Sequence, residues 1–147
     1  MPLMTFKANS EWSGEGVYAD VTSRHFKIAA DEPPALGGTD KAMNPVELLL
    51  GALASCLTIV AVFYANKLGY DVEDVSVDTE GDLDPAGFTG QDESVRPGFQ
   101  QVRARLNIVS SEPRERIEEL AKIAFSHCPV SNTLSGVEVK EEIVIKN

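Results

Sequence analysis

Cys56 and Cys128, the two cysteines of this sequence, are the residues whose chemistry suggests a function most directly. A cysteine thiolate attacks electrophiles, and two thiols interconvert with a disulfide. Cys56 lies within an apolar segment, whereas Cys128 directly precedes Pro129 at the predicted start of a short helix. Because a helix N-terminus stabilises a thiolate, the sequence alone favours Cys128 as the attacking thiol. Two inert core cysteines are the alternative, since buried free cysteines often do no more than pack.

Metal binding and hydrolase chemistry find little support in the positions of the histidines. The candidate ligands of a zinc site are His25, Cys56, His127 and Cys128. Their order lacks the C-x-x-C and H-x-x-x-H spacings typical of structural zinc. His127 and Cys128 are adjacent, and side chains of sequence neighbours point apart, so a Cys/His hydrolase pair is disfavoured as well. The sequence also lacks a Gly-rich phosphate loop, and we expect neither a metal nor a cofactor.

The composition predicts one globular domain over residues 1–147. Hydrophobic residues make up 43% of the chain and charged residues 24%, as in ordinary soluble proteins. The net charge of −10 argues against a nucleic-acid partner and against binding to an anionic membrane, because phosphate groups would be repelled. The first residues lack the basic and apolar regions of a secretory signal, so we expect a cytoplasmic protein. In that reducing compartment the cysteines are expected as free thiols.

The hydrophobic pattern predicts an α+β fold with mainly antiparallel strand pairing. Alternating and turn-forming residues indicate strands in the first third, then a loop, a long helix, and a second group of strands and helices. The expected elements are strands at 5–12, 17–22 and 26–30, a loop at 31–43, a helix from 44 that stops near 69, strands at 72–81 and 100–109 around an exposed excursion at 84–98, helices at 113–125 and 129–134, and a strand at 137–145.

The long helix is the most informative element of this pattern. Asn44, Pro45 and Glu47 form an N-terminal capping sequence, and Gly69 suits the end of the helix. From residue 48 to residue 65 no residue is charged, a length that just reaches a membrane span. Burial in a soluble core is the favoured interpretation, because the run contains small polar residues and lacks an aromatic belt.

A domain of this size has difficulty covering so apolar a helix with its own sheet. Gly51 and Ser55 are four residues apart in the helix, and so are Ala52 and Cys56. Small residues at that spacing let two helix backbones approach closely. We therefore predict a homodimer in which two such helices share one core.

Two motifs in this order resemble those of the OsmC/Ohr family, the osmotically induced and organic hydroperoxide resistance proteins. Residues 44–56, NPVELLLGALASC, resemble the family signature of an N-P-x-E-L stretch leading into small residues and a cysteine. Residues 127–132, HCPVSN, resemble its second motif, C-P-V/Y-S. Residues 31–34 and 36–38 match the loop before the central helix, and the order of elements agrees over nearly the whole chain.

This resemblance implies an OsmC-like fold, in which sheets wrap a long central helix in an intertwined homodimer with both cysteines at the dimer interface. In peroxidase members the first cysteine attacks a small organic hydroperoxide, and its sulfenic acid condenses with the second cysteine. Cys56 is then the peroxidatic residue and Cys128 the resolving one, which reverses the order favoured by the helix N-terminus. A dithiol, in the family sometimes a lipoyl group, regenerates the thiols. We expect no nucleic-acid or membrane partner.

The sequence departs from the organic hydroperoxide resistance branch at two helper residues, of which the first is a glutamate directly after the helix-opening proline. Here Val46 occupies that position and Glu47 follows it. Glu47 precedes Cys56 by nine residues, which places the two side chains on opposite sides of a straight helix. Glu47 is thus either a catalytic residue or a member of a capping box with Asn44.

The second departure concerns the arginine that the branch carries in its early hairpin turn. The corresponding segment, residues 13–16, contains no arginine, and the nearest basic candidate is Arg24. Arg24 is either an exposed charge at the end of a strand or a cation that reaches the cysteine and favours its thiolate.

These departures keep a second function open. An OsmC-like protein without peroxidase activity would bind a small apolar ligand in the dimer pocket or sense oxidants through the cysteine pair. Turnover distinguishes the two, because an enzyme consumes many peroxide molecules per thiol pair whereas a sensor is oxidised once. Inert cysteines would not be oxidised by mild peroxide.

Overall fold

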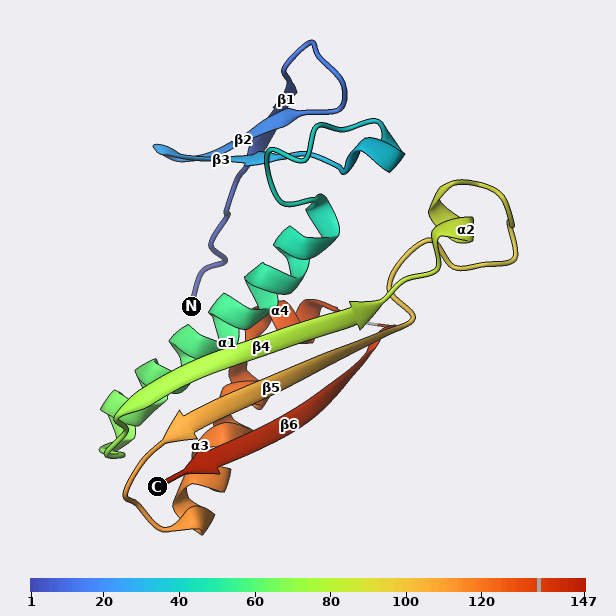
Figure 1. The fold of residues 1–147 in the computed structure, drawn as a ribbon. Helices are drawn as coiled ribbons and strands as arrows, with labels where there is room; N and C mark the ends of the chain where they lie inside the picture. Colours follow the sequence, from blue (N-terminus) through green and yellow to red (C-terminus); the bar gives the residue numbers. More distant parts are fainter. Residues whose placement is uncertain (135) are drawn as a thin grey trace. The chain divides into compact units, whose positions relative to one another are not determined.

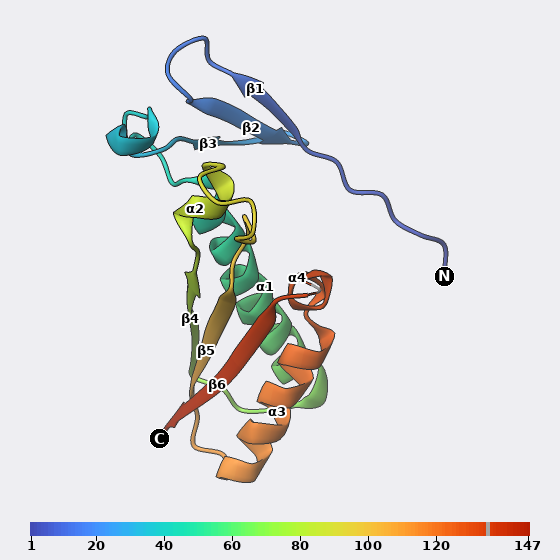
Figure 2. The same ribbon diagram turned by 90° about the vertical axis from the view of Figure 1, so that its right-hand side faces the viewer.

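The computed structural model describes residues 1–134 and 136–147, which form two compact units. The first unit comprises Met1–Leu49 and the second Leu50–Asn147. Each unit contains one three-stranded sheet (Figures 1 and 2). The expectation of a single domain over residues 1–147 stays a prediction.

The first unit is built on an antiparallel meander of strands β1 (Asn9–Trp12), β2 (Ala19–Ser23) and β3 (Phe26–Ala30). β1 is shorter than the predicted strand at 5–12, because its partner β2 ends at Ser23. The chain before β1 is held by a hydrogen bond from Ser23 Oγ to the carbonyl oxygen of Lys7 (2.8 Å).

The loop after β3 is organised around the buried carboxylate of Asp31. Its Oδ2 accepts hydrogen bonds from the Thr39 hydroxyl (2.7 Å) and from the N–H groups of Thr39 and Lys41 (3.2 Å each), and Oδ1 accepts from the Glu32 N–H (2.8 Å). These bonds, above all that from the Thr39 hydroxyl, lower the pKa of Asp31 to about 2. The loop also contains a short 3-10 helix, Pro34–Leu36, which the sequence pattern did not predict.

The long helix α1 (Pro45–Leu68) begins and ends where the sequence predicts. Asn44 Oδ1 accepts a hydrogen bond from the Glu47 N–H (2.9 Å) and so caps the N-terminus. At the other end Gly69 has a φ of +77°, a conformation that glycine adopts without strain. The N–H of Tyr70 then donates to the carbonyl oxygen of Ala65 (2.9 Å) and closes the helix.

The second unit contains a sheet of β4 (Asp74–Asp82), β5 (Gln101–Val109) and β6 (Glu138–Lys146), with β5 in the centre. β4 pairs antiparallel with β5, whereas β5 and β6 are parallel. Parallel strands need a crossover connection, which α3 (Arg114–His127) and α4 (Pro129–Thr133) provide. The prediction of mainly antiparallel pairing is therefore confirmed, with β5–β6 as the exception.

The two faces of this second sheet have different surroundings. α1 and α3 lie on the same face (Figure 2). Along β5, buried residues alternate with more exposed ones, as expected for a strand that is covered on one face only. The core between helices and sheet consists of small and branched apolar side chains. It includes Leu53, Leu57, Ala61 and Ala65 of α1, Val102, Ala104, Leu106 and Ile108 of β5, and Ile117, Leu120, Ala121, Ala124 and Phe125 of α3.

The predicted excursion between β4 and β5 contains one further short helix, α2 (Pro85–Phe88). Asp84 Oδ1 caps it by accepting a hydrogen bond from the Ala86 N–H (2.9 Å). Four residues are too few to show helical periodicity, so the sequence pattern did not reveal this element.

α1 buries one side and leaves an apolar stripe on the other. The stripe is formed by Ile59, Val62 and Phe63, whose exposed fractions are 67%, 42% and 56%. The α+β fold with a long apolar helix is confirmed. The intertwined homodimer that would cover the stripe stays a prediction.

Candidate active site

The second unit brings the two predicted cysteines into contact. Cys56 lies in the middle of α1, and Cys128 is the residue between α3 and α4. The Cys128 thiol donates a hydrogen bond to Cys56 Sγ, with 2.8 Å between the two sulfur atoms. Both are free thiols, and a disulfide would require the sulfurs to approach to about 2.05 Å. The pair therefore has the geometry of a dithiol that can close with little movement.

The two thiols have unequal surroundings. Cys128 is completely buried, and Cys56 is half-buried. Burial raises the pKa of Cys128 to about 11, the hydrogen bond with Cys56 acts in the same direction, and the N–H of Ser131, 3.3 Å from Cys128 Sγ, opposes it. The direction of this shift opposes the prediction that Cys128 is the better thiolate, because loss of solvation at the buried sulfur outweighs the N-terminus of a five-residue helix. The raised pKa favours the thiol form of Cys128, and Cys56 is the more exposed residue of the two.

Residues of α4 that sequence reasoning did not single out hold Cys128 in place. Besides the contact from Ser131, the side-chain Nδ2 of Asn132 donates to the carbonyl oxygens of Cys128 (2.8 Å) and Ser126 (3.3 Å). The signal was present in the sequence, because Ser and Asn shortly after a Cys-Pro pair are residue types that bond to nearby backbone groups.

Glu47 lies at the third position of α1 and is exposed. Its backbone N–H is bound by Asn44 Oδ1, which is the Asn44 half of the predicted capping box. Nine residues of helix correspond to about 13 Å along the axis, in addition to the half-turn that separates Glu47 from Cys56. The catalytic assignment of Glu47 stays a prediction.

Arg24 lies in the tight turn between β2 and β3, in the first unit, with a φ of +55°. Its guanidinium carbon is 4.8 Å from the centre of the Phe26 ring, a cation–π arrangement. The cysteines belong to the second unit, and a role of Arg24 towards them stays a prediction.

The histidines are placed by aromatic contacts. The His127 ring packs against Tyr64 of α1, with 4.9 Å between ring centres, and His25 packs against Phe26 at 4.0 Å. Over residues 1–134 and 136–147, no group of three or more His, Cys, Asp or Glu side chains is arranged to hold a metal ion.

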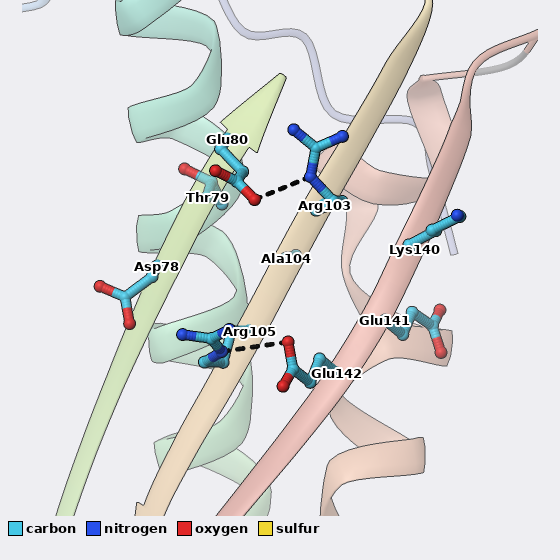
Figure 3. A pocket seen from close by; sticks show the side chains of 9 residues that line it. All are labelled: Asp78, Thr79, Glu80, Arg103, Ala104, Arg105, Lys140, Glu141 and Glu142. Carbon is cyan, nitrogen blue, oxygen red and sulfur yellow. Dashed lines mark hydrogen bonds and ion pairs between the residues drawn. The ribbon is translucent and has the colours of Figure 1, made fainter. Parts of the chain in front are cut away.

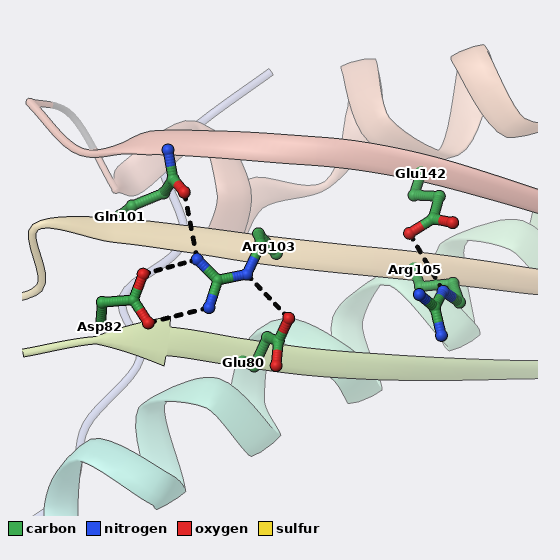
Figure 4. Close-up of polar contacts among 6 residues, drawn as sticks. All are labelled: Glu80, Asp82, Gln101, Arg103, Arg105 and Glu142. Atoms are coloured by element: carbon green, nitrogen blue, oxygen red, sulfur yellow. Dashed lines mark hydrogen bonds and ion pairs between the residues drawn. The ribbon is translucent and has the colours of Figure 1, made fainter.

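A hollow of about 420 Å³ lies on the other face of the second sheet, away from α1 and α3 (Figure 3). Neither cysteine lines it. Its arginines are bonded to acidic neighbours, as Figure 4 shows. Arg103 binds Asp82 through two hydrogen bonds (2.6 and 2.9 Å) and Glu80 through a third (2.7 Å), and Arg105 binds Glu142 (3.0 Å). The arginines of this hollow thus belong to a surface network of ion pairs. The cysteine pair remains the candidate site.

Comparison with known proteins decides the family. Residues 38–142 match the family model described as OsmC-like protein, and this range includes both cysteines. The chain belongs to the OsmC-like protein family. Among the residues that the structure describes, α1 alone has the length and apolar composition of a membrane span, with a mean hydropathy of 2.3. In this soluble family fold, α1 is a core helix that contributes Leu53, Leu57, Ala61 and Ala65 to the interior.

Individual relatives agree with the assignment to this family. The uncharacterized protein YmaD of Bacillus subtilis (strain 168) is 26% identical over 150 residues, covering 96% of this chain and 94% of YmaD. An OsmC-like protein from Mycoplasma pneumoniae has a TM-score of 0.84 at 19% identity, covering 98% and 99% of the two chains. An organic hydroperoxide resistance protein OsmC from Legionella pneumophila has a TM-score of 0.69 at 24% identity, covering both chains completely. These solved structures share the fold of this OsmC-like protein.

Proposed function

We propose that this protein is a thiol peroxidase that reduces small organic hydroperoxides through Cys56 and Cys128. The observation that carries the proposal is the 2.8 Å contact between an accessible sulfur, Cys56, and a buried, protonated one, Cys128. Such a pair suits two-step chemistry, in which one thiol meets the substrate and the other completes the reaction. The name of the Legionella pneumophila relative supports the same class of substrate.

In the first step Cys56 Sγ, as a thiolate, attacks the terminal oxygen of the hydroperoxide. A sulfur–oxygen bond forms and the oxygen–oxygen bond breaks, so that the sulfur is oxidised to a sulfenic acid. The leaving alkoxide takes up, through water, the proton that the Cys56 thiol released, and departs as the alcohol. The hydrogen bond donated by Cys128 stabilises negative charge on the attacking sulfur. Ala52, Ser55 and Ile59 are the exposed neighbours of Cys56 on α1, and they give the approaching substrate a largely apolar surface.

In the second step Cys128 attacks the sulfenic acid of Cys56. The sulfur–sulfur bond forms, the sulfur–oxygen bond breaks, and the hydroxide takes up the proton released by Cys128 and leaves as water. A dithiol of the lipoyl type then reduces the disulfide by two exchanges and becomes a cyclic disulfide itself. We propose a cytoplasmic location, where a pool of reduced dithiols is maintained.

The proposed active form is a homodimer. The exposed stripe of Ile59, Val62 and Phe63 lies on the helix that carries Cys56. A second copy of the chain would remove this apolar surface from water and enclose the sulfur in a dry pocket. Sedimentation of the purified protein tests this, and a monomer at micromolar concentration would contradict it.

Arg24 and Glu47 are the proposed helper residues. Arg24 would stabilise the thiolate or the leaving oxygen, and Glu47 would orient that arginine. The variants Arg24→Gln and Glu47→Gln keep size and polarity, and a true helper role predicts a slower first step at unchanged folding. If Glu47→Gln alone leaves the rate unchanged, Glu47 serves the N-terminus of α1 and nothing more.

The experiment that tests the proposal is a thiol count on reduced protein titrated with cumene hydroperoxide and, separately, with hydrogen peroxide. We expect one equivalent of cumene hydroperoxide to remove both thiols and hydrogen peroxide to react much more slowly. Cys56→Ser should abolish the reaction, whereas Cys128→Ser should stop at a sulfenic acid that dimedone traps. Persistence of both thiols in the wild-type protein at stoichiometric peroxide would overturn the proposal.

A ligand-binding or oxidant-sensing protein is the second candidate. It is favoured by the position of Glu47, which is exposed and bound by its cap rather than placed beside Cys56. Turnover with excess peroxide and a dithiol separates the two functions. Many peroxide molecules consumed per protein indicate the enzyme, and a single oxidation indicates the sensor.

A further inference from the structure

Asn132 on α4 connects the two helices that meet at Cys128. One amide hydrogen of its side chain goes to the Cys128 carbonyl oxygen (2.8 Å), and the other goes to the Ser126 carbonyl oxygen in the last turn of α3 (3.3 Å). The Asn132 N–H also donates to the Cys128 carbonyl oxygen (3.0 Å). The side chain thus spans the corner between α3 and α4.

The carbonyl groups at this corner need a side-chain hydrogen-bond donor. The last carbonyl groups of a helix have no partner within the helix, and Pro129 provides no N–H at the start of α4. Cys128 itself is extended, with φ −75° and ψ 112°, and α4 is only five residues long. A helix of one turn has little stability of its own, so its direction depends on such cross-links.

We propose that Asn132 is a positioning residue for the resolving step, an inference that rests on the proposed peroxidase function. Cys56 and Cys128 lie on separate elements, and the 2.8 Å between their sulfurs depends on the corner at Cys128. Asn132 fixes the backbone of Cys128 against α3, while the Ser131 N–H holds its sulfur (3.3 Å). A primary amide suits the position because it offers two N–H donors, whereas a carboxylate offers none.

The step that Asn132 serves is the attack of Cys128 Sγ on the sulfenic sulfur of Cys56. The sulfur–sulfur bond replaces the sulfur–oxygen bond, and the proton of Cys128 leaves with the hydroxide as water. Asn132 touches neither the substrate nor the reacting sulfurs, and it bears on the first step only indirectly, through the hydrogen bond that the Cys128 thiol donates to Cys56 Sγ. The second step uses Cys128 Sγ itself as the attacking atom and is therefore the more sensitive one. The inference therefore predicts a selective defect in the second step.

Three variants on α4 separate positioning from helix stability. Asn132→Ala removes both side-chain hydrogen bonds, and Asn132→Ser retains one hydroxyl within reach of the Cys128 carbonyl oxygen but loses the link to Ser126. Thr133→Val is the matched control, because the Thr133 hydroxyl donates to the Pro129 carbonyl oxygen (2.7 Å) within α4. That bond stabilises the same helix without reaching α3.

The measurement is a rapid-mixing reaction of the full-length reduced protein with one equivalent of cumene hydroperoxide, quenched with dimedone. Because small misplacements of reacting groups are costly, we expect the sulfenic acid of Asn132→Ala to live about tenfold longer than that of the wild type. Peroxide consumption should stay within about twofold. Asn132→Ser should be intermediate, and Thr133→Val should match the wild type. If Asn132→Ala does not fold, Asn132→Ser decides.

Three results would overturn the inference: wild-type resolution in the folded Asn132 variants, an equal slowing by Thr133→Val, or an equal slowing of both steps. If the wild type itself ignores peroxide, the proposed function has failed, and the positioning role is tested by equilibrating the thiol pair in dithiothreitol buffers. There the disulfide of Asn132→Ala should be reduced more readily, by about tenfold in the equilibrium constant. Equal equilibrium constants would exclude the positioning role.

Discussion

The two faces of the β4–β5–β6 sheet differ, because the central strand β5 directs apolar side chains into the core on one face and charged side chains to the surface on the other. On the helix-covered face, Leu106 is fully buried, and the elements packed there bring two thiols together. On the other face, Arg103 and Arg105 are bonded to carboxylates in an exposed network. A hollow rich in charge is a poor guide to a candidate site when its arginines are already bonded to carboxylates. The cysteine pair, which is the candidate site, lies on the helix-covered face.

The largest difference between the two faces is expected in stability. Leu106→Ala removes a fully buried side chain and should lower the free energy of unfolding by about 2–5 kcal/mol, since it leaves a cavity in the core. The matched control is Arg105→Ala in the same strand, which removes an exposed ion pair. Urea denaturation followed by circular dichroism measures both. Similar losses in the two variants would contradict the assignment of the faces.

The next effect concerns the reactivity of the buried thiol. In Cys56→Ser, Cys128 is the remaining thiol, and burial, the main cause that raises its pKa above the ordinary 9.0, persists when the Cys56 sulfur is gone. The rate of alkylation by iodoacetamide should therefore keep rising between pH 9 and 11 and should not level off near 9. Cys128→Ser provides the reference for Cys56. A plateau near pH 9 in Cys56→Ser would show that burial does not govern the Cys128 thiol.

Asp31 in the first unit is also buried, but its carboxylate accepts four hydrogen bonds. It therefore shows how hydrogen bonds change the pKa of a buried group in the direction opposite to burial. Its folded pKa of about 2 lies below the ordinary 3.8, so it stabilises the fold above about pH 4 and loses that contribution as the pH falls from 4 to 2. Asp31→Asn should be less stable than the wild type at pH 6, and the difference should vanish near pH 2. Trp12, in the same unit, reports unfolding by fluorescence, and Asp20→Asn is the surface control.

The smallest effect is expected from the ion-pair network of the open face. Hydrogen bonds from Arg103 lower the pKa of Asp82, yet both side chains are substantially exposed, so water and salt screen the interaction. Arg103→Gln should change stability much less than Leu106→Ala, and it should leave peroxide reduction unchanged. Thermal unfolding at low and high salt checks the first expectation. A loss of peroxidase activity would make the open face part of the site.

Local patterns were sufficient to predict most elements of the fold. The cap at Asn44, the stop at Gly69 and the alternation of β5 each depend on residues that are close in the chain. α2 and the short 3-10 helix were missed because they are shorter than the period that would reveal them. The error at Cys128 had another origin, since its burial depends on helices that are distant in the sequence.

The sequence by itself determined the family and the two cysteines, because motifs and periodicity are properties of neighbouring residues. Only the tertiary structure decided that burial raises the pKa of Cys128, that the two sulfurs are 2.8 Å apart, and that Asn132 donates to carbonyl oxygens on both sides of the corner at Cys128. Along the chain, the rest of α1, then β4, α2, β5 and α3, separate Cys56 from Cys128. Their distance and solvation are therefore set by packing across the whole second unit, which local spacing does not encode.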